Sequence, residues 1–357
     1  MNTLVLSGGG AKGAYTAGVI YHLLEKQVAG EPFQLAIGTS TGALAAGPAL
    51  LEDHRYLRNV YVGVDDSDIM QNSWLGKLVS LFVKGSVPIQ ASMEPLYQIL
   101  KKYYIDDGKL EVLQQSGKTL IATSVNARTG KIEYVSSNEV GNSISAKTFI
   151  RSILASASVP LFTRPVKIYE NEPGHKYQND LFYDGGIKEF LPLQQAIRLG
   201  AEKIWAISNH PPRFNTTEWG GNTRPENVNF IKILKWLISS TLNEVERGDL
   251  FRALAFHRIG LARTELQSLS STKGWDKKTT QQLLKIIDDI FPFIPDKLKE
   301  LHVITPSRPM AASLEFDPEV MLGYFTDGIL TARSYRNNLH NSSGHADINE
   351  FINCKLI

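Results

Sequence analysis

The first fifty residues alternate between short apolar runs, glycine-rich turns and segments of helical spacing. The run Leu4–Leu6 ends at a set of glycines, and Ala14–Glu25 then carries apolar side chains at helical intervals. The run Leu35–Ile37 repeats the pattern, because a second glycine-flanked turn separates it from the small-residue segment Ala43–Leu51. Apolar runs bounded by glycine indicate buried strands, and apolar positions three and four apart indicate helices. Two successive strand–turn–helix units predict parallel strands.

In the rest of the chain, the predicted secondary structure changes near residue 210 from mainly strands to mainly helices. Before that point the pattern predicts strands at Thr119–Ser124, Lys131–Val135 and Lys203–Ser208 and a helix through Phe149–Leu154. After it, a loop rich in proline and glycine precedes predicted helices at Phe230–Phe256, Thr279–Ile290 and Pro318–Asn337 and a candidate strand at Leu301–Ile304. We therefore expect a core over residues 1–210 and a helical addition over 211–357, whose last strand and helix pack back on the core. A covering insertion is expected over 61–95.

The composition excludes several classes of protein. Of the 357 residues, 43% are hydrophobic and 21% charged, as in globular proteins rather than disordered or fibrous ones. Since 38 basic and 36 acidic residues leave a formal net charge of only +2, we expect no nucleic-acid partner. The single cysteine, Cys354, permits no intrachain disulfide. The sequence shows no signal peptide and no membrane-spanning apolar stretch of about 20 residues, which predicts a cytoplasmic protein.

Gly8, Gly10 and Gly13 form a motif with two interpretations. The spacing GxGxxG between a strand and a helix is that of a dinucleotide-binding loop, which predicts an oxidoreductase. That fold also uses an acidic residue after its second strand, whereas the second strand here leads into Gly-Thr-Ser-Thr-Gly. In the alternative, the amides of Gly9 and Gly10 converge at a helix N-terminus and stabilise an oxyanion. Lys12 would then be a cationic neighbour able to meet a lipid phosphate.

Ser40 lies in the spacing Gly38-x-Ser40-x-Gly42, between a predicted strand and a predicted helix. This is the pattern of a nucleophile elbow, in which a sharp turn exposes the serine hydroxyl. A serine needs a neighbouring base to take its proton. Among the eight histidines, His210 and His302 follow predicted strands and are candidates for a Ser-His-Asp triad, although no flanking motif supports either.

Asp184 is the other candidate base, because it follows an apolar stretch and precedes two glycines that allow a turn toward the serine. Taken in order, Gly8–Gly13, Gly38–Gly42 and Asp184–Gly186 resemble the signature of patatin-like phospholipases. The segment Ala155–Phe162 is similar to a further stretch of that family, which lies between the nucleophile and the aspartate. The resemblance covers residues 1 to about 210. It implies a three-layer α/β/α fold with a mostly parallel central sheet.

The resemblance also implies a Ser-Asp dyad that cleaves fatty acyl esters of lipids through an acyl-enzyme intermediate, without a metal or cofactor. Ser40 would be the nucleophile and Asp184 the base. The other residues implied are the oxyanion loop (Gly8, Gly9, Gly10, Lys12, Gly13), the elbow glycines (Gly38, Gly42) and the aspartate-loop glycines (Gly185, Gly186). The expected partner is a lipid ester, a phospholipid or lysophospholipid above all, with transient contact with a membrane surface. A catalytically silent patatin-like binding scaffold is the alternative.

Two departures from the family pattern bear on the site. Ser7 stands where many members have aspartate, and Phe190 stands where an asparagine is common, which we expect to change how the aspartate loop is braced. Outside the motifs, the apolar face of Phe230–Leu242 fits a core-packing helix or a lipid-facing lid. Acyl chain length and headgroup preference depend on pocket walls that the motifs do not include.

Overall fold

A computed structural model describes residues 1–63, 91–160, 162–211, 230–272, 276–290, 298–307, 310 and 316–341; within 230–272 it describes the side chains of 241 and 244–268, and within 316–341 those of 316–338. The covering insertion expected over 61–95 therefore lies, for residues 64–90, outside the described part. The same holds for the loop predicted after Pro211 and for the apolar face predicted on Phe230–Leu242.

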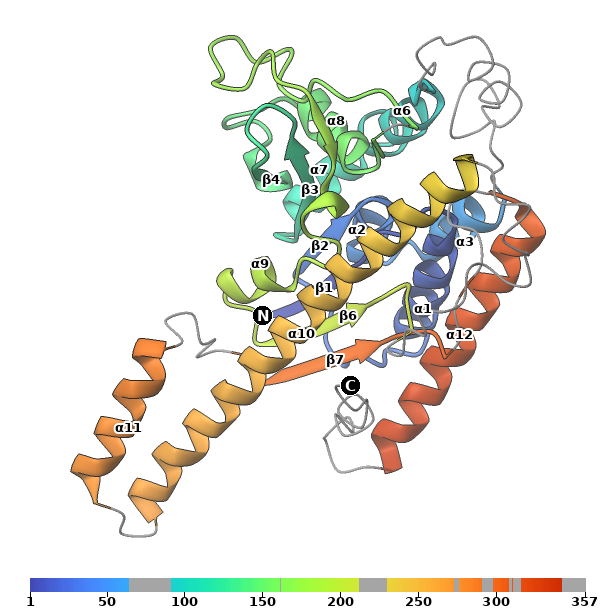
Figure 1. The fold of residues 1–357 in the computed structure, drawn as a ribbon. Helices are drawn as coiled ribbons and strands as arrows, with labels where there is room; N and C mark the ends of the chain where they lie inside the picture. The colour runs from blue at the N-terminus through green and yellow to red at the C-terminus, as the bar shows by residue number, and fades with distance from the viewer. Residues whose placement is uncertain are drawn as a thin grey trace.

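The centre of the molecule is a seven-stranded sheet in which most strands are parallel (Figure 1). Its strands are β1 (Asn2–Leu6), β2 (Leu35–Thr39), β3 (Thr119–Asn126), β4 (Ile132–Ser136), β5 (Phe182–Asp184), β6 (Lys203–Ile207) and β7 (Glu300–Ile304). The order across the sheet is β4-β3-β2-β1-β6-β7, with β5 paired to β3. Strands β3, β2, β1, β6 and β7 are parallel neighbours, whereas β4 and β5 run antiparallel to β3.

Successive side chains of the central strands enter two different cores, because a strand presents alternate residues to opposite faces. In β1, Leu4 and Leu6 belong to the larger core and Val5 to the smaller one. The helices of the larger-core side are α1 (Gly13–Glu25), α2 (Thr41–Leu50), α3 (His54–Gly63), α6 (Glu94–Lys101), α7 (Lys109–Gln115), α8 (Ala146–Ser156) and α12 (Pro318–Asn341). On the smaller-core side lie α9 (Leu193–Arg198) and α10 (Phe230–Thr272). The expected three-layer α/β/α fold with a mostly parallel sheet is confirmed.

The last strand and helix pack on the rest of the fold. Strand β7 extends the sheet beyond β6, and α12 packs along α1 through glycines on both helices. A Cβ atom at Gly18 would lie 2.0 Å from the Phe325 carbonyl oxygen, and one at Gly328 would lie 2.2 Å from the Tyr15 carbonyl oxygen. The two backbones therefore touch where the helices cross, which only glycine allows.

Helix α10 is longer than the sequence predicts, reaching Thr272 rather than Phe256, since no proline interrupts that stretch. Its second half pairs with α11 (Lys277–Ile290), and the two project from the sheet as a helical hairpin (Figure 1). Among the described residues, no helix is both long enough and apolar enough to cross a bilayer.

Candidate active site

Ser40 lies on a strained turn between β2 and α2. Its backbone has φ 56° and ψ −127°, a left-handed region that a side chain occupies only when the surroundings enforce it. The turn is enforced by tight packing, because a Cβ atom at Gly38 would lie 2.3 Å from the Gly42 backbone and one at Gly42 would lie 2.5 Å from the Leu6 carbonyl oxygen. The sharp turn between strand and helix that the motif predicts is therefore present, and both of its glycines are sterically required.

Strand β3 brings Asp184 to Ser40. Residues 119–123 of β3 pair with β2, so that Thr39 lies opposite Thr123. The next residues of β3 pair with β5 in the opposite direction, and Asp184 lies opposite Ser124. Strands β2 and β5 thus meet end to end along one edge of β3, with Ser40 and Asp184 at the junction. The Ser40 side chain lies close enough to the Asp184 carboxyl to lower its pKa.

The end of α8 and the residues that follow it contact both Ser40 and Asp184. The Ser40 amide donates to the Ser156 hydroxyl oxygen at 2.9 Å, and the Asp184 amide donates to the Ser158 carbonyl oxygen at 2.9 Å. Both contacts come from the segment Ala155–Phe162, which the sequence singled out only by resemblance. The structure shows that this segment holds the serine and the aspartate side by side.

Asp184 is buried, with only 5% of the residue's surface exposed. Burial raises the pKa of its carboxyl to about 7, while the hydrogen bond from the Gly186 amide, 2.7 Å from Oδ1, and the nearby Ser40 side chain act to lower it. Desolvation disfavours the charged form of a carboxyl, so the group holds its proton more strongly than in water. An apparent pKa near neutrality is suited to a group that takes and returns a proton.

The glycine loop approaches the same turn, but not all of its residues face Ser40. Gly10 lines the cavity beside Ser40. The Gly8 amide donates to the Phe190 carbonyl oxygen at 3.3 Å, and the Gly13 amide donates back into the 3₁₀ turn Gly10–Lys12. Those two amides therefore bond within the protein. The assignment of the oxyanion donors to Gly9 and Gly10, within the loop Gly8–Gly13, stays a prediction.

Lys12 differs from its expected position. Its side chain is 4% exposed and its Nζ lies 3.2 Å from Nε2 of His210. Burial lowers the pKa of Lys12 to about 8, and the carboxylate of Glu246 acts to raise it. The expectation that this ammonium meets a lipid phosphate is therefore wrong, because α10 carries Glu246 and covers the lysine.

The two histidine candidates lie away from Ser40. His302 is on β7, three strands from β2 and so roughly 14 Å across the sheet at ~4.8 Å per strand. Its ring stacks on Trp205 with centroids 4.1 Å apart, and its nitrogens bond Tyr335 and Glu300. His210 follows β6, two strands from β2, and is held between Lys12 and Glu246. Neither histidine is placed to take the Ser40 proton.

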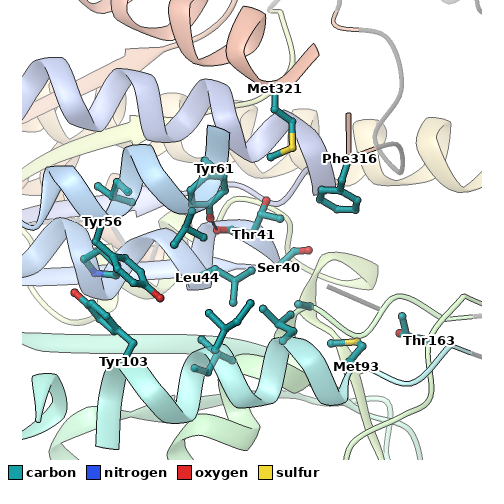
Figure 2. A pocket seen from close by; sticks show the side chains of 18 of the residues that line it. Ser40, Thr41, Leu44, Tyr56, Tyr61, Met93, Tyr103, Thr163, Phe316 and Met321 are labelled. Atoms are coloured by element: carbon teal, nitrogen blue, oxygen red, sulfur yellow. Dashed lines mark hydrogen bonds between the residues drawn. The ribbon is translucent and has the colours of Figure 1, made fainter. Parts of the chain in front are cut away.

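A cavity of about 100 Å³ opens beside Ser40 on the larger-core side (Figure 2). Its walls are almost entirely apolar or aromatic and come from α2, α3, α6, α12, the turn after α6 with Tyr103 and Tyr104, and the side chains of Phe162 and Phe316. Figure 2 shows Ser40 nearer to Met93 and Phe316, whereas Tyr56 and Tyr103 lie at the opposite end. The hydroxyl of Ser40 thus borders a pocket shaped for a hydrocarbon group.

Three polar residues around the site, Asn209, Glu246 and Asp249, were not identified from the sequence. Asn209 bonds the Gly8 carbonyl oxygen at 2.8 Å and accepts a bond from Thr16. Glu246 and Asp249 are also buried here. The residues next to them in the sequence form no recognisable motif. They reach the loops only through the strand order of the sheet and the course of α10. In the described part of the chain, no group of His, Cys, Asp or Glu side chains is arranged to hold a metal ion.

Comparisons with known proteins agree with the motifs. The family model described as patatin-like phospholipase matches residues 4–197, more than half of the chain. The uncharacterized protein YjjU of Escherichia coli (strain K12) is 25% identical over 244 residues, which cover 67% of this chain and 58% of YjjU. The match therefore spans less than two thirds of that relative's length. The crystal structure of VipD from Legionella pneumophila is similar with a TM-score of 0.44 at 15% identity, covering 94% of this chain and 67% of that chain.

Proposed function

Because the chain belongs to the patatin-like phospholipase family, we propose that it is a lipid acyl hydrolase in which Ser40 is the nucleophile and Asp184 the general base. One observation carries the proposal. Ser40 occupies a strained, glycine-enforced turn beside a buried carboxylate and borders an apolar cavity. Each of these three features has a use in acyl transfer.

In the proposed reaction, Asp184 accepts the Ser40 proton as Oγ attacks the ester carbonyl carbon. The carbonyl oxygen becomes negatively charged, and the amides of Gly9 and Gly10 donate hydrogen bonds to it at the start of the first helix. The tetrahedral intermediate collapses, the Oγ–acyl bond remains, and the alcohol leaves with the proton from Asp184. Water then attacks the acyl-enzyme with Asp184 again accepting a proton; the Oγ–acyl bond breaks, Oγ takes the proton from Asp184, and the fatty acid leaves. These steps use no metal or cofactor.

The substrate class follows from the cavity. A pocket lined by aliphatic and aromatic side chains favours burial of a hydrocarbon chain, at roughly 0.8 kcal/mol per methylene. We propose a phospholipid or lysophospholipid as substrate, with the acyl chain in the cavity and the headgroup outside it. Since such lipids are held in aggregates, the proposal includes transient contact with a membrane surface and no nucleic-acid partner.

Fluorophosphonate labelling combined with ester turnover tests the proposal. We expect the unmodified protein to be labelled at Ser40, and Ser40→Ala to lose both labelling and turnover. Asp184→Asn should stay folded but react more slowly by on the order of 10²–10⁴-fold, the usual contribution of a general base. His302→Ala is the control and should keep full turnover, because His302 lies three strands away. An unlabelled, inactive unmodified protein would favour the silent scaffold, and full turnover by Ser40→Ala would refute the assignment.

A further inference from the structure

Two buried carboxylates on α10 face the loops of the active site. Glu246 and Asp249 are three residues apart, so their side chains lie on the same face of the helix. Only 3% of Glu246 and 1% of Asp249 is exposed. Both lie beyond residue 197, where the match to the family model ends.

Asp249 holds the loop that follows Asp184. Its Oδ2 accepts hydrogen bonds from the Phe190 amide at 2.9 Å and the Leu191 amide at 3.1 Å. Its Oδ1 accepts from Arg252 on the same helix. The loop between Asp184 and Leu191 contains the 3₁₀ turn Gly185–Ile187, which packs against α10. One carboxylate oxygen therefore sets where the far end of the aspartate loop lies.

Phe190 connects this loop to the glycine loop. Its carbonyl oxygen accepts from the Gly8 amide, and its ring packs against Gly8 of one loop and Gly186 of the other. A Cβ atom at Gly8 would lie 2.8 Å from the ring, and one at Gly186 would lie 2.6 Å from it. A shift of the Phe190 backbone would thus displace both the glycine loop and the aspartate loop, which flank Ser40. This is the place where the sequence departs from the family pattern.

Glu246 reaches the glycine loop through two side chains. Its Oε2 bonds Nδ1 of His210, and Nε2 of His210 meets Nζ of Lys12. An ammonium only donates, so Nε2 accepts and the ring proton lies on Nδ1, facing the carboxylate. Burial lowers the pKa of His210, which agrees with a neutral ring. Lys12 directly follows Gly10 and Ala11, so this chain of contacts ties the oxyanion loop to α10.

Neither carboxylate is explained by stability alone. Burying a charged group is costly, and apolar residues of similar size often stabilise such a position as well or better. Burial raises the pKa of Asp249 to about 6, because removing the carboxyl from water disfavours its charged form. What the two carboxylates provide is directional contact with loops that carry the reacting groups.

We propose that Glu246 and Asp249 are positioning residues, through which α10 holds the glycine loop and the aspartate loop in the geometry that acyl transfer requires. The inference rests on the proposed function of Ser40 and Asp184. It makes the region beyond residue 197 part of the active site rather than an appended cover.

The test compares Asp249→Ala, Asp249→Asn and Arg263→Ala in the full chain. Arg263→Ala removes an ion pair with Asp288 on the hairpin, on the same helix but away from the loops. With a soluble short-chain ester, Asp249→Ala should lower kcat roughly 10- to 100-fold with KM within about twofold, because small displacements of reacting groups have large effects on rate. Asp249→Asn keeps an oxygen acceptor, so its kcat should lie within about fivefold of that of the unmodified protein. Arg263→Ala should have the same kcat as the unmodified protein.

Hydrogen exchange gives a readout that does not depend on turnover. Asp249→Ala should accelerate exchange of the Phe190 and Leu191 amides, while Arg263→Ala leaves both unchanged. If Asp249→Ala does not fold, Asp249→Glu replaces it, because it keeps the charge and moves the carboxylate by one methylene. A roughly tenfold loss of kcat is then expected.

Glu246 is tested in the same way, with Glu246→Ala slowing fluorophosphonate labelling of Ser40 roughly tenfold and Glu246→Gln largely restoring it. The proposal is overturned if the Ala variants fold and retain unmodified kcat, labelling rate and amide exchange. That result, together with an inactive Ser40→Ala variant, would leave the proposed function standing. If Ser40→Ala were fully active, the proposed function would fail, and accelerated exchange in Asp249→Ala would still show the structural contact.

Discussion

Replacing the buried Asp184 with asparagine should stabilise the protein increasingly as pH rises. Asparagine has nearly the same shape, and its side-chain oxygen can still accept the bond that the Gly186 amide makes to Oδ1. It cannot ionise, however, so the variant removes only the burial of a negative charge. The comparison therefore isolates the quantity that makes Asp184 a suitable base.

The magnitude follows from the difference in pKa between the folded and unfolded chain. Burial raises the pKa of Asp184 from 3.8 to about 7, and each pKa unit corresponds to about 1.36 kcal/mol. The unfolded chain loses this proton near pH 4 and the folded chain near pH 7, so the folded state binds more protons between them. Stability contributed by the protonated carboxyl is thus present below pH 4 and lost as pH rises through 7. The whole loss is about 4 kcal/mol, with about 2.5 kcal/mol of it between pH 5 and pH 8.

Urea denaturation at pH 5, 6, 7 and 8 measures this difference. The free energy of unfolding of Asp184→Asn, minus that of the unmodified protein, should grow by roughly 2–3 kcal/mol from pH 5 to pH 8. Other buried acids, such as Glu189 and Asp249, are present in both proteins and cancel. Asp180→Asn is the matched control, because bonds from Arg128 and Asn126 lower the pKa of Asp180 and its charge does not change above pH 5.

A difference that stays flat between pH 5 and pH 8 would refute the reasoning. It would mean that the Asp184 carboxyl is ionised at no cost in the folded protein. The pH dependence of kcat/KM gives an independent check, since activity should rise with pH around 7 as Asp184 loses its proton. A rise around pH 4 would contradict the buried environment.

Two further predictions concern packing. Gly328→Ala should destabilise the fold by about 1–3 kcal/mol in urea denaturation, because the new Cβ would lie 2.2 Å from the Tyr15 carbonyl oxygen. Gly323→Ala on the same helix has no atom within 4 Å and should be neutral or stabilising by up to ~1 kcal/mol, so equal effects would contradict the proposed helix contact. Tyr56→Ala opens the cavity end opposite Ser40 and should raise the ratio of kcat/KM for long over short acyl esters roughly tenfold. Tyr97→Ala, outside the cavity wall, should leave that ratio unchanged.

The sequence by itself determined the α/β class, the two strand–turn–helix units and the elbow at Ser40. These features depend on short-range rules. Gly38 and Gly42 flank Ser40 within five residues, and the apolar runs that predict β1 and β2 are continuous segments. The order of the glycine, serine and aspartate motifs also indicated the family. Each motif reflects a local turn of the backbone, and such a turn is specified by consecutive residues that can be recognised in the sequence.

Only the tertiary structure decided which groups share the site. Ser40 and Asp184 are 144 positions apart in the numbering, and they meet because β3 pairs first with β2 and then with β5. The same strand order moved His210 and His302 away from the serine. The course of α10 buried Lys12 and brought Asp249 to the aspartate loop. Strand order and helix course arise from contacts between distant segments, and a pattern of apolar and polar residues along the chain specifies which faces are buried but not which partners cover them.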